Sequence, residues 1–434
     1  MASLARGGLE LADYNQMWTD LGMDLERHDV LLCALPAIYK PMFLERENRP
    51  KAMEYFDFVV SEIHGLRIKE IVDHKADDGK VVGAFCVYVP EEMVIAAGGI
   101  CVGLCAGAEI SVGSAEEILP RNLCPLIKSA VGFRLERICP YFQACDLVVG
   151  ETTCDGKKKA WEVLADYAPM HVMELPQRKG DKDKELWASE LVDFKGKLEE
   201  LTGNRITEES LGAAIKLVDT KRAALQRLYE LRKASPPPIS GLDSLLIAQV
   251  YFNDDPARFT AKTNELCDEL ETRVKEKIGI TESAVPRILI SGCPMIIPNW
   301  KVPYLVESCG AAVVCEESCT GTRLLTGDTI VRGNGIESQI SAIAERQLKT
   351  NCACFTPNDD RIDDILNLCD DYNIDGVIHY SLQFCQPYMV EAEKAKKALG
   401  KKGVPMLALE TDYGDGDTGQ LRTRIEAFLE QVSK

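Results

Sequence analysis

The sequence is poor in the residues and motifs that mark the common enzyme sites. It has five histidines in 434 residues, so a histidine-rich metal site is not expected. It lacks the GxxxxGK[ST] pattern of phosphate-binding loops and the HExxH pattern of zinc proteases, and it has neither the GxSxG pattern of hydrolases nor the CxxC pattern of thioredoxins. These absences exclude a P-loop nucleotidase and the most familiar hydrolase and protease sites, so other residue types must carry the chemistry.

Positive charge and long apolar runs are also scarce. Fifty basic residues face 68 acidic ones, which gives a net charge of −18. An acidic surface repels phosphate backbones and anionic lipids, so we expect no nucleic acid and no membrane among the partners. Residues 93–108 are uncharged, but sixteen residues are fewer than the roughly 20 needed to cross a bilayer. Residues 1–15 carry charges and no continuous apolar stretch, so we expect a cytoplasmic protein.

The hydrophobic pattern divides the chain into three parts. Residues 1–78 read as a mainly helical segment. Short apolar, β-branched runs then alternate with helical stretches, first from residue 81 and again from residue 286. Such alternation predicts parallel sheets covered by helices on both faces. We expect an α/β protein with two Rossmann-like or flavodoxin-like parallel-sheet domains, residues 79–235 and 236–434, the second beginning with a helical connector.

Cysteine is abundant, with 17 residues. An odd number cannot pair completely, and a reducing compartment disfavours disulfides. Seven cysteines lie in loops, several of them directly after predicted strands: Cys105, Cys124, Cys154, Cys319, Cys352, Cys354 and Cys385. Loops at the carboxyl ends of parallel strands converge, so these thiolates can meet and bind a soft metal. Spacing alone leaves zinc, iron–sulfur and simple burial open. The other cysteines, including Cys86 and Cys267, are interpreted as core packing.

Five sequence motifs point to a known family. They are residues 122–125 (NLCP), 148–158 (VVGETTCDGKK), 287–292 (RILISG), 375–385 (DGVIHYSLQFC) and 419–428 (GQLRTRIEAF). With these motifs the chain, from about residue 80 onward, resembles the 2-hydroxyacyl-CoA dehydratase and benzoyl-CoA reductase family of iron–sulfur proteins. The resemblance implies that Cys124, Cys154 and Cys385 hold one [4Fe–4S] cluster.

The chain differs from an ordinary dehydratase subunit in its additional loop cysteines. Cys105, Cys319 and one of Cys352 and Cys354 form a second candidate triad. This pattern is similar to the double-cubane cluster proteins of the same family. The resemblance therefore implies an [8Fe–9S] cluster, in which a sulfide joins two [4Fe–4S] cubanes. Three thiolates per cubane leave one iron of each without a protein ligand, where a substrate can bind. The choice between Cys352 and Cys354 stays open.

The resemblance also implies an activity. We expect an oxygen-sensitive oxidoreductase, a homodimer, that reduces a small-molecule substrate with low-potential electrons from a separate ATP-dependent iron–sulfur reductase. The missing P-loop agrees with ATP hydrolysis on that partner. One alternative is a 2-hydroxyacyl-CoA dehydratase subunit, a lyase with a single [4Fe–4S] cluster and a ketyl radical mechanism. Another is a non-catalytic cluster carrier.

Two residues near the expected site are candidate catalytic proton donors, namely His379 and Glu317. For His379 the competing interpretation is a hydrogen-bonded core histidine at a strand end. Lys157, Lys158 and Lys159 follow Cys154, and they are interpreted either as a solvated helix face or as a docking site for an acidic partner.

Overall fold

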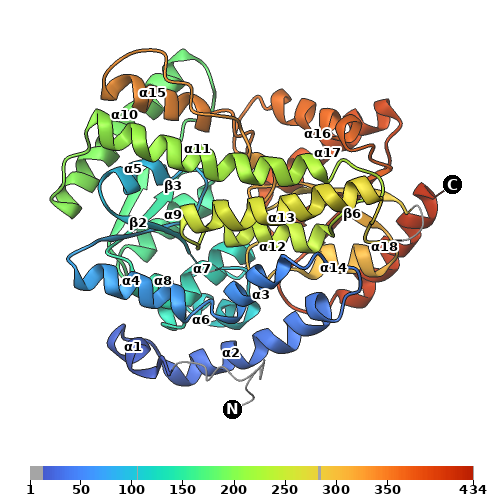
Figure 1. The fold of residues 1–434 in the computed structure, drawn as a ribbon, viewed down its shortest axis with the longest axis horizontal. Coiled ribbons are helices and arrows are strands. Elements are labelled where there is room, and N and C mark those ends of the chain that lie inside the picture. Colours follow the sequence, from blue (N-terminus) through green and yellow to red (C-terminus); the bar gives the residue numbers. More distant parts are fainter. Residues whose placement is uncertain (1–12, 105, 282–284, 434) are drawn as a thin grey trace.

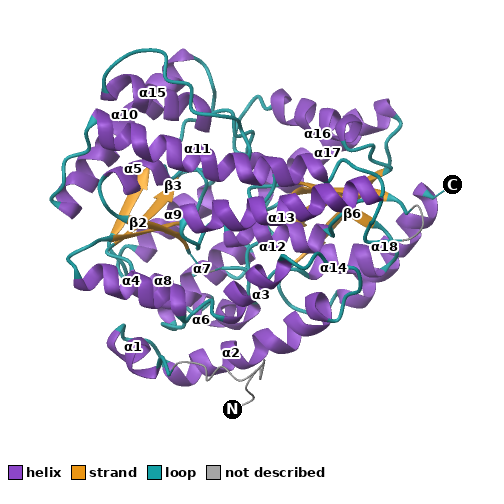
Figure 2. Ribbon diagram, viewed as in Figure 1, coloured by secondary structure: helices purple, strands orange, loops and turns teal. Residues whose placement is uncertain are grey.

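The computed structural model describes residues 13–104, 106–281 and 285–433. Figure 1 shows two groups of strands, one toward each end of the molecule, with the long helices α11 (Glu208–Leu231) and α13 (Pro256–Glu276) running across the middle. Helices surround both groups of strands (Figure 2). Among the described residues, no helix combines the length and the apolar character needed to cross a membrane.

Each group of strands is a four-stranded parallel sheet. The first sheet has the order β2-β1-β3-β4 and the second has the order β6-β5-β7-β8. The strands of the first are β1 (Val81–Ala84), β2 (Ile100–Gly103), β3 (Leu147–Glu151) and β4 (Met170–Met173). Those of the second are β5 (Arg287–Gly292), β6 (Ala312–Glu317), β7 (Gly376–Leu382) and β8 (Met406–Thr411). The expected α/β fold with two parallel sheets is confirmed, and the two sheets repeat one strand order.

Three of the four central strands are buried along their whole length, as expected for parallel sheets with two covered faces. Every residue of β3, β5 and β7 is buried. The apolar run that begins at Val81 extends beyond Ala84, but β1 already ends at that residue. The strand is therefore shorter than the hydrophobicity of the run predicts. Beyond it, the ring of Phe85 stacks on that of Trp161 with 4.7 Å between centroids, and Pro90 stands at the start of the next helix.

The helices fall into four groups along the chain. The N-terminal segment contains α1 (Asn15–Asp20), α2 (Leu25–Tyr39) with a π-helical turn (Lys40–Leu44), α3 (Met53–Ser61) and α4 (Leu66–Ala76). The first sheet is accompanied by α5 (Glu91–Ala96), a 3-10 turn (Glu109–Ser111), α6 (Val112–Ala115), α7 (Pro125–Leu135), α8 (Pro140–Ala144) and α9 (Asp155–Leu164). Between the sheets lie α10 (Asp181–Thr202), α11, α12 (Gly241–Val250) and α13. The second sheet is accompanied by α14 (Lys301–Ser308), a 3-10 turn (Thr322–Leu324), α15 (Ile336–Gln347), α16 (Asp359–Asp371), α17 (Gln386–Lys402) and α18 (Thr418–Val432).

Part of the second half completes the core of the first half. Helix α15 packs on α10 and α11, and Figure 1 shows it beside α10 although the two are far apart in the sequence. Trp187 on α10 donates from Nε1 to Gln347 Oε1 at 2.9 Å, and Tyr88 Oη donates to the carbonyl of Thr350 at 2.8 Å. Both hydrogen bonds are buried, and they hold the end of α15 against α10 and the loop after α15 against the loop after β1.

Candidate functional site

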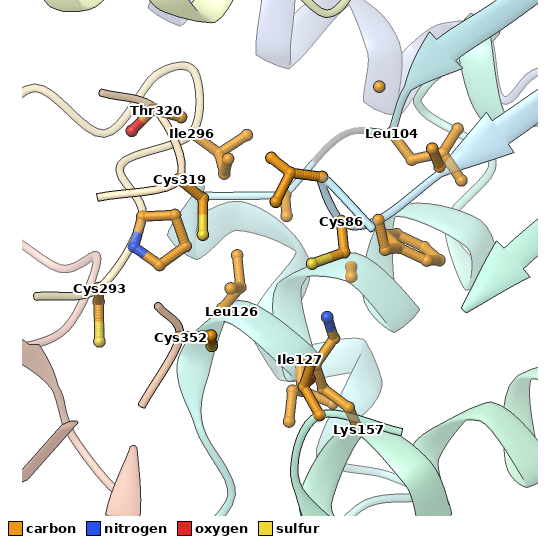
Figure 3. Close-up of a pocket in the computed structure, with 18 of the residues that line it drawn as sticks. Cys86, Leu104, Leu126, Ile127, Lys157, Cys293, Ile296, Cys319, Thr320 and Cys352 are labelled. Atoms are coloured by element: carbon orange, nitrogen blue, oxygen red, sulfur yellow. The ribbon is translucent and has the colours of Figure 1, made fainter. Parts of the chain in front are cut away.

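A cavity of about 1060 Å³ lies among the loops that follow strands of both sheets. Nine cysteines line it: Cys86, Cys101, Cys124, Cys154, Cys293, Cys319, Cys352, Cys354 and Cys385. Six of the seven cysteines predicted as ligands are in this set, and the seventh, Cys105, lies outside the described residues. The close-up in Figure 3 shows that Cys86, Cys293, Cys319 and Cys352 approach this space from different loops.

Three of these thiols stand at helix N-termini. Cys124, Cys154 and Cys385 are the N-cap residues of α7, α9 and α17. The thiols of Cys124 and Cys385 hydrogen-bond to each other, and Cys154 is near enough to interact electrostatically with Cys124. The backbone N–H of Leu126 donates to the sulfur of Cys124, and that of Lys157 donates to the sulfur of Cys154. Helix N-termini stabilise negative charge, so this set favours thiolates once a metal offsets the cost of burial.

A second group of thiols comes entirely from the second half of the chain, which also supplies Cys385 of the first group. Cys319 follows β6, and Cys352 and Cys354 lie in the loop after α15. Arg323 Nη1 lies 3.5 Å from the sulfur of Cys319, and Tyr388 Oη lies 3.7 Å from that of Cys352. Hydrogen bonding from the Cys354 thiol, supported by Arg323, lowers the pKa of Cys352 to about 6, whereas burial raises the pKa of Cys319 to about 11. The pair of Cys352 and Cys354 therefore loses a proton more readily than Cys319, and the hydrogen bond between the two thiols stabilises the thiolate.

Three further thiols in the cavity, those of Cys86, Cys101 and Cys293, belong to the cysteines that the sequence favours as core packing. Cys86 follows β1 and lies near enough to Cys319 and Cys352 for electrostatic interaction, and its sulfur points into the cavity in Figure 3. Cys293 follows β5, and its thiol hydrogen-bonds with that of Cys385. Cys293 comes directly after a predicted strand, which is the signal that identified other loop cysteines, but its apolar neighbours favoured core packing. Cys86 lies inside the apolar run that begins at Val81, so the sequence pattern did not mark it as a loop residue.

The lysines that follow Cys154 do not share one environment. Lys158 and Lys159 are exposed and pair with acidic neighbours on α9, as a solvated helix face predicts. Lys157 is different, because its side chain is only 14% exposed and lines the cavity. Its Nζ donates to Oε1 of Glu151, a fully buried carboxylate at the end of β3. For Lys157 the solvated-face interpretation is wrong, since the side chain extends inward from the first turn of the helix.

His379 lies in the core of the second sheet and is absent from the cavity wall. Its Nε2 is 3.0 Å from the carbonyl oxygen of Tyr388, and burial, supported by Arg361, lowers its pKa to about 4. The imidazole is therefore neutral at pH 7. This placement agrees with the competing interpretation of a hydrogen-bonded core histidine.

Glu317 also lies behind the cavity wall, held by buried arginines. Its carboxylate accepts hydrogen bonds from Arg323 Nε at 2.7 Å, from Arg361 Nη2 at 2.8 Å and Nε at 3.2 Å, and from Ser291 Oγ at 2.7 Å. Burial alone would raise the pKa of Glu317, but the two guanidinium groups more than offset this and hold it below its usual value. An ionised carboxylate has no proton to donate, so this geometry gives a proton-donor role no support.

A glycine pattern missed by the sequence reasoning lies at residues 414–419, where Gly-x-Gly-x-x-Gly follows β8 and leads into α18. That context is typical of a dinucleotide fingerprint. Here, however, the carboxylate of Asp417 occupies the helix start and accepts hydrogen bonds from Lys301 Nζ at 2.8 Å and from Thr411 Oγ1. A carboxylate at this point repels phosphate, so the pattern does not form a nucleotide site.

The comparisons with known proteins agree with this picture. Residues 86–432 match the family described as 2-hydroxyglutaryl-CoA dehydratase, D-component. The chain belongs to this family, which confirms the resemblance to the 2-hydroxyacyl-CoA dehydratases and benzoyl-CoA reductases seen in the sequence motifs. The matched region contains the second sheet, the first sheet except β1, and every described cysteine of the cavity.

Three relatives illustrate the range of the family. "Putative dehydratase subunit YjiM" of Escherichia coli (strain K12) is 39% identical over 376 residues, which are 86% of this chain and 96% of the relative. The (R)-phenyllactyl-CoA dehydratase beta subunit of Clostridium sporogenes is 24% identical, with 84% and 95% covered. One of the subunits of benzoyl-CoA reductase from Thauera aromatica is 21% identical, with 81% and 91% covered. The relatives are thus subunits of dehydratases and of a reductase.

Proposed function

We propose that this protein is an iron–sulfur oxidoreductase that carries a double-cubane [8Fe–9S] cluster in the cysteine-lined cavity and reduces a small molecule. The observation that supports this proposal most directly is the meeting of thiols from both halves of the chain around one cavity of about 1060 Å³. Thiolates are soft ligands that suit iron–sulfur clusters.

The number of thiols fits a cluster better than a single ion. Nine cysteines line the cavity, whereas one zinc ion takes four ligands. Within the described parts of the chain, no group of three histidine, cysteine or acidic side chains is arranged to hold one metal ion. The abundance of thiols supports the proposal of a polynuclear centre.

We assign the ligands in two sets. Cys124, Cys154 and Cys385 hold one cubane. Cys319 and the Cys352 thiolate, with Cys354 as the alternative to Cys352, supply two ligands of the other. The third ligand of that cubane is Cys105, as the sequence predicts, or Cys86, whose sulfur points into the cavity (Figure 3).

When bound, the cluster supplies one-electron chemistry at low potential, and the chain provides its environment. Apolar side chains of α2, α7 and α9, including Leu31, Phe133 and Trp161, form much of the cavity wall and exclude water. Electrons arrive from a separate ATP-dependent iron–sulfur reductase, since the sequence carries no P-loop pattern. We also propose that the protein is cytoplasmic and forms a homodimer. Each chain divides near residue 235 into two α/β units.

A second candidate is a 2-hydroxyacyl-CoA dehydratase subunit with one [4Fe–4S] cluster. It is favoured by the names of several relatives, which are dehydratase subunits. This candidate requires acyl-CoA binding, a different partner subunit and only the first set of ligands. A non-catalytic cluster carrier differs from both in transferring no electrons to a substrate.

Iron analysis of protein purified without oxygen separates these functions. About eight irons per chain supports the double-cubane proposal, and about four supports the dehydratase subunit. An iron-free protein contradicts both. The Cys86→Ser and Cys105→Ser variants, analysed side by side, identify the remaining ligand, because only loss of a ligand lowers the iron content. Failure of the reduced, iron-loaded protein to transfer electrons to any acceptor would favour the carrier.

A further inference from the structure

Lys157 places a buried positive charge at the cavity wall. Its side chain is 14% exposed, against 45% for Lys158 and 69% for Lys159 on the same helix. In Figure 3 the side chain of Lys157 rises from α9 and its nitrogen lies beside the sulfur of Cys86. A lysine is seldom buried without a partner, so the surroundings of this ammonium group determine what it can do.

The partner of Lys157 lies on the side away from the cavity. Glu151 ends β3, is completely buried and does not line the cavity. Its Oε1 accepts from Lys157 Nζ and from Thr153 Oγ1, the latter at 3.1 Å, and its Oε2 has no hydrogen-bond partner among the described residues. The Trp161 ring covers another side of the ammonium group, 5.6 Å from its centroid. The ion pair thus has its positive end at the cavity and its negative end in the protein.

The ammonium group of Lys157 has hydrogen-bond donors that Glu151 does not use. It carries three N–H bonds, and Glu151 is the one acceptor found for it in the described part of the chain. The other two N–H bonds are available on the side of the cavity, where Cys86 and Cys154 lie. Stability does not explain this arrangement, because a well-packed apolar pair of similar volume is commonly as stable as a buried ion pair.

The second group of thiols has a similar cation. Arg323 Nη1 lies 3.5 Å from the sulfur of Cys319, and its Nε donates to Glu317, which does not line the cavity. Each group of thiols therefore meets a buried cation that has a carboxylate behind it. Repetition of this arrangement in two unrelated loops indicates a common electrostatic purpose.

We propose that Lys157, with Glu151 as its counter-ion, is a positioning residue that raises the reduction potential of the cluster. The inference rests on the proposed function, since it assumes a cluster in the cavity. A positive charge in a weakly screened site stabilises the more negative, reduced state of the neighbouring centre, and hydrogen bonds to cluster sulfur act in the same direction. Glu151 partly cancels this charge, so the two residues have opposite effects on the potential.

The test is a redox titration of iron-loaded protein followed by electron paramagnetic resonance. Lys157→Met is compared with Lys157→Arg, with Glu151→Gln and with the exposed control Lys158→Met. We expect Lys157→Met to lower the reduced-to-oxidised ratio at a fixed potential about tenfold, which is a shift of about 59 mV to more negative values for one electron. Lys157→Arg restores most of the potential, Lys158→Met leaves it unchanged, and Glu151→Gln moves it in the positive direction.

The outcomes separate this inference from the proposed function. Wild-type protein without iron contradicts both of them. Wild-type protein with iron, whose potential is the same in Lys157→Met, contradicts only the inference. Shifts of equal sign in Lys157→Met and Glu151→Gln also contradict it, because a merely structural role gives no reason for opposite signs. If Lys157→Met does not retain iron, Glu151→Gln tests the inference on its own. A positive shift of its reduction potential supports the inference, and a negative or absent shift contradicts it.

Discussion

Replacement of Glu317 by glutamine tests whether this residue supports the fold or donates protons. The carboxylate accepts four hydrogen bonds, of which three come from the guanidinium groups of Arg323 and Arg361. A glutamine has one acceptor oxygen and turns an N–H₂ group toward donors. Removal of one partner from a buried ion pair typically costs about 3–5 kcal/mol, and we expect a loss of this size in Glu317→Gln.

Urea unfolding followed by circular dichroism measures this loss. The matched control is Asp359→Asn, which removes an exposed pair with Lys394 at 2.6 Å, where the side chains are 73% and 48% exposed. Exposed pairs contribute about 0–1 kcal/mol, so the control should unfold like wild type. If Glu317→Gln unfolds at the wild-type urea concentration and yet loses substrate reduction, our reasoning is refuted and the carboxylate is a proton donor.

The pH dependence of the same comparison gives a second check. The arginines hold the pKa of Glu317 in the folded protein below the value of 4.5 taken for the unfolded chain. Its stabilising contribution is therefore fully present above pH 4.5 and is lost as the pH falls through the folded pKa. We expect the stability difference between wild type and Glu317→Gln to be constant near neutrality and to shrink below about pH 4.5.

Three further predictions concern the thiols and the backbone near them. Cys385→Ser should lose about half of the iron, because a hydroxyl is a poor ligand for iron in a cluster. The control Cys267→Ser changes a cysteine of α13 in the hydrophobic core and should keep all of the iron. Equal iron contents in the two variants would contradict the ligand assignment. In metal-free protein at pH 7.5, iodoacetamide should label Cys352 well before Cys319, because the pKa is about 6 for Cys352 and about 11 for Cys319. Peptide mass spectrometry measures the order of labelling, and the reverse order would contradict the local electrostatics. Gly292→Ala should destabilise the fold by about 1–3 kcal/mol or more and so lower the urea midpoint. Gly292 has a φ of +136°, and an added Cβ would meet the backbone carbonyl of Tyr380. An unchanged midpoint would contradict this prediction.

The fold was largely predictable from the sequence, because buried strands in a parallel sheet leave a strong signal. The apolar run of β5 and the one that opens with Val81 predict strands directly, and both sheets are present. The length of a strand was less predictable. The run from Val81 continues past Ala84 in hydrophobicity, but Phe85 packs on Trp161 instead of extending the sheet.

The site was predictable in part. Loop positions, several of them directly after strands, identified six described cysteines that the structure brings to one cavity. The same reasoning missed Cys86 and misread Lys157, since an apolar context and a charge run each have a more common explanation. The orientation of Lys157 depends on Glu151, and the burial of that carboxylate beneath α9 is a property of tertiary packing that sequence spacing does not contain.

The position of α15 limits how the cavity can open. Its end and the loop after it are fastened to the first half by buried hydrogen bonds, and Arg346 forms a buried ion pair with Glu92 at 2.9 Å. Rigid-body separation of the halves would break all of these contacts at once. In the proposed function, a substrate would therefore reach the cavity through local displacement of side chains or short loops at its rim, without separation of the two halves.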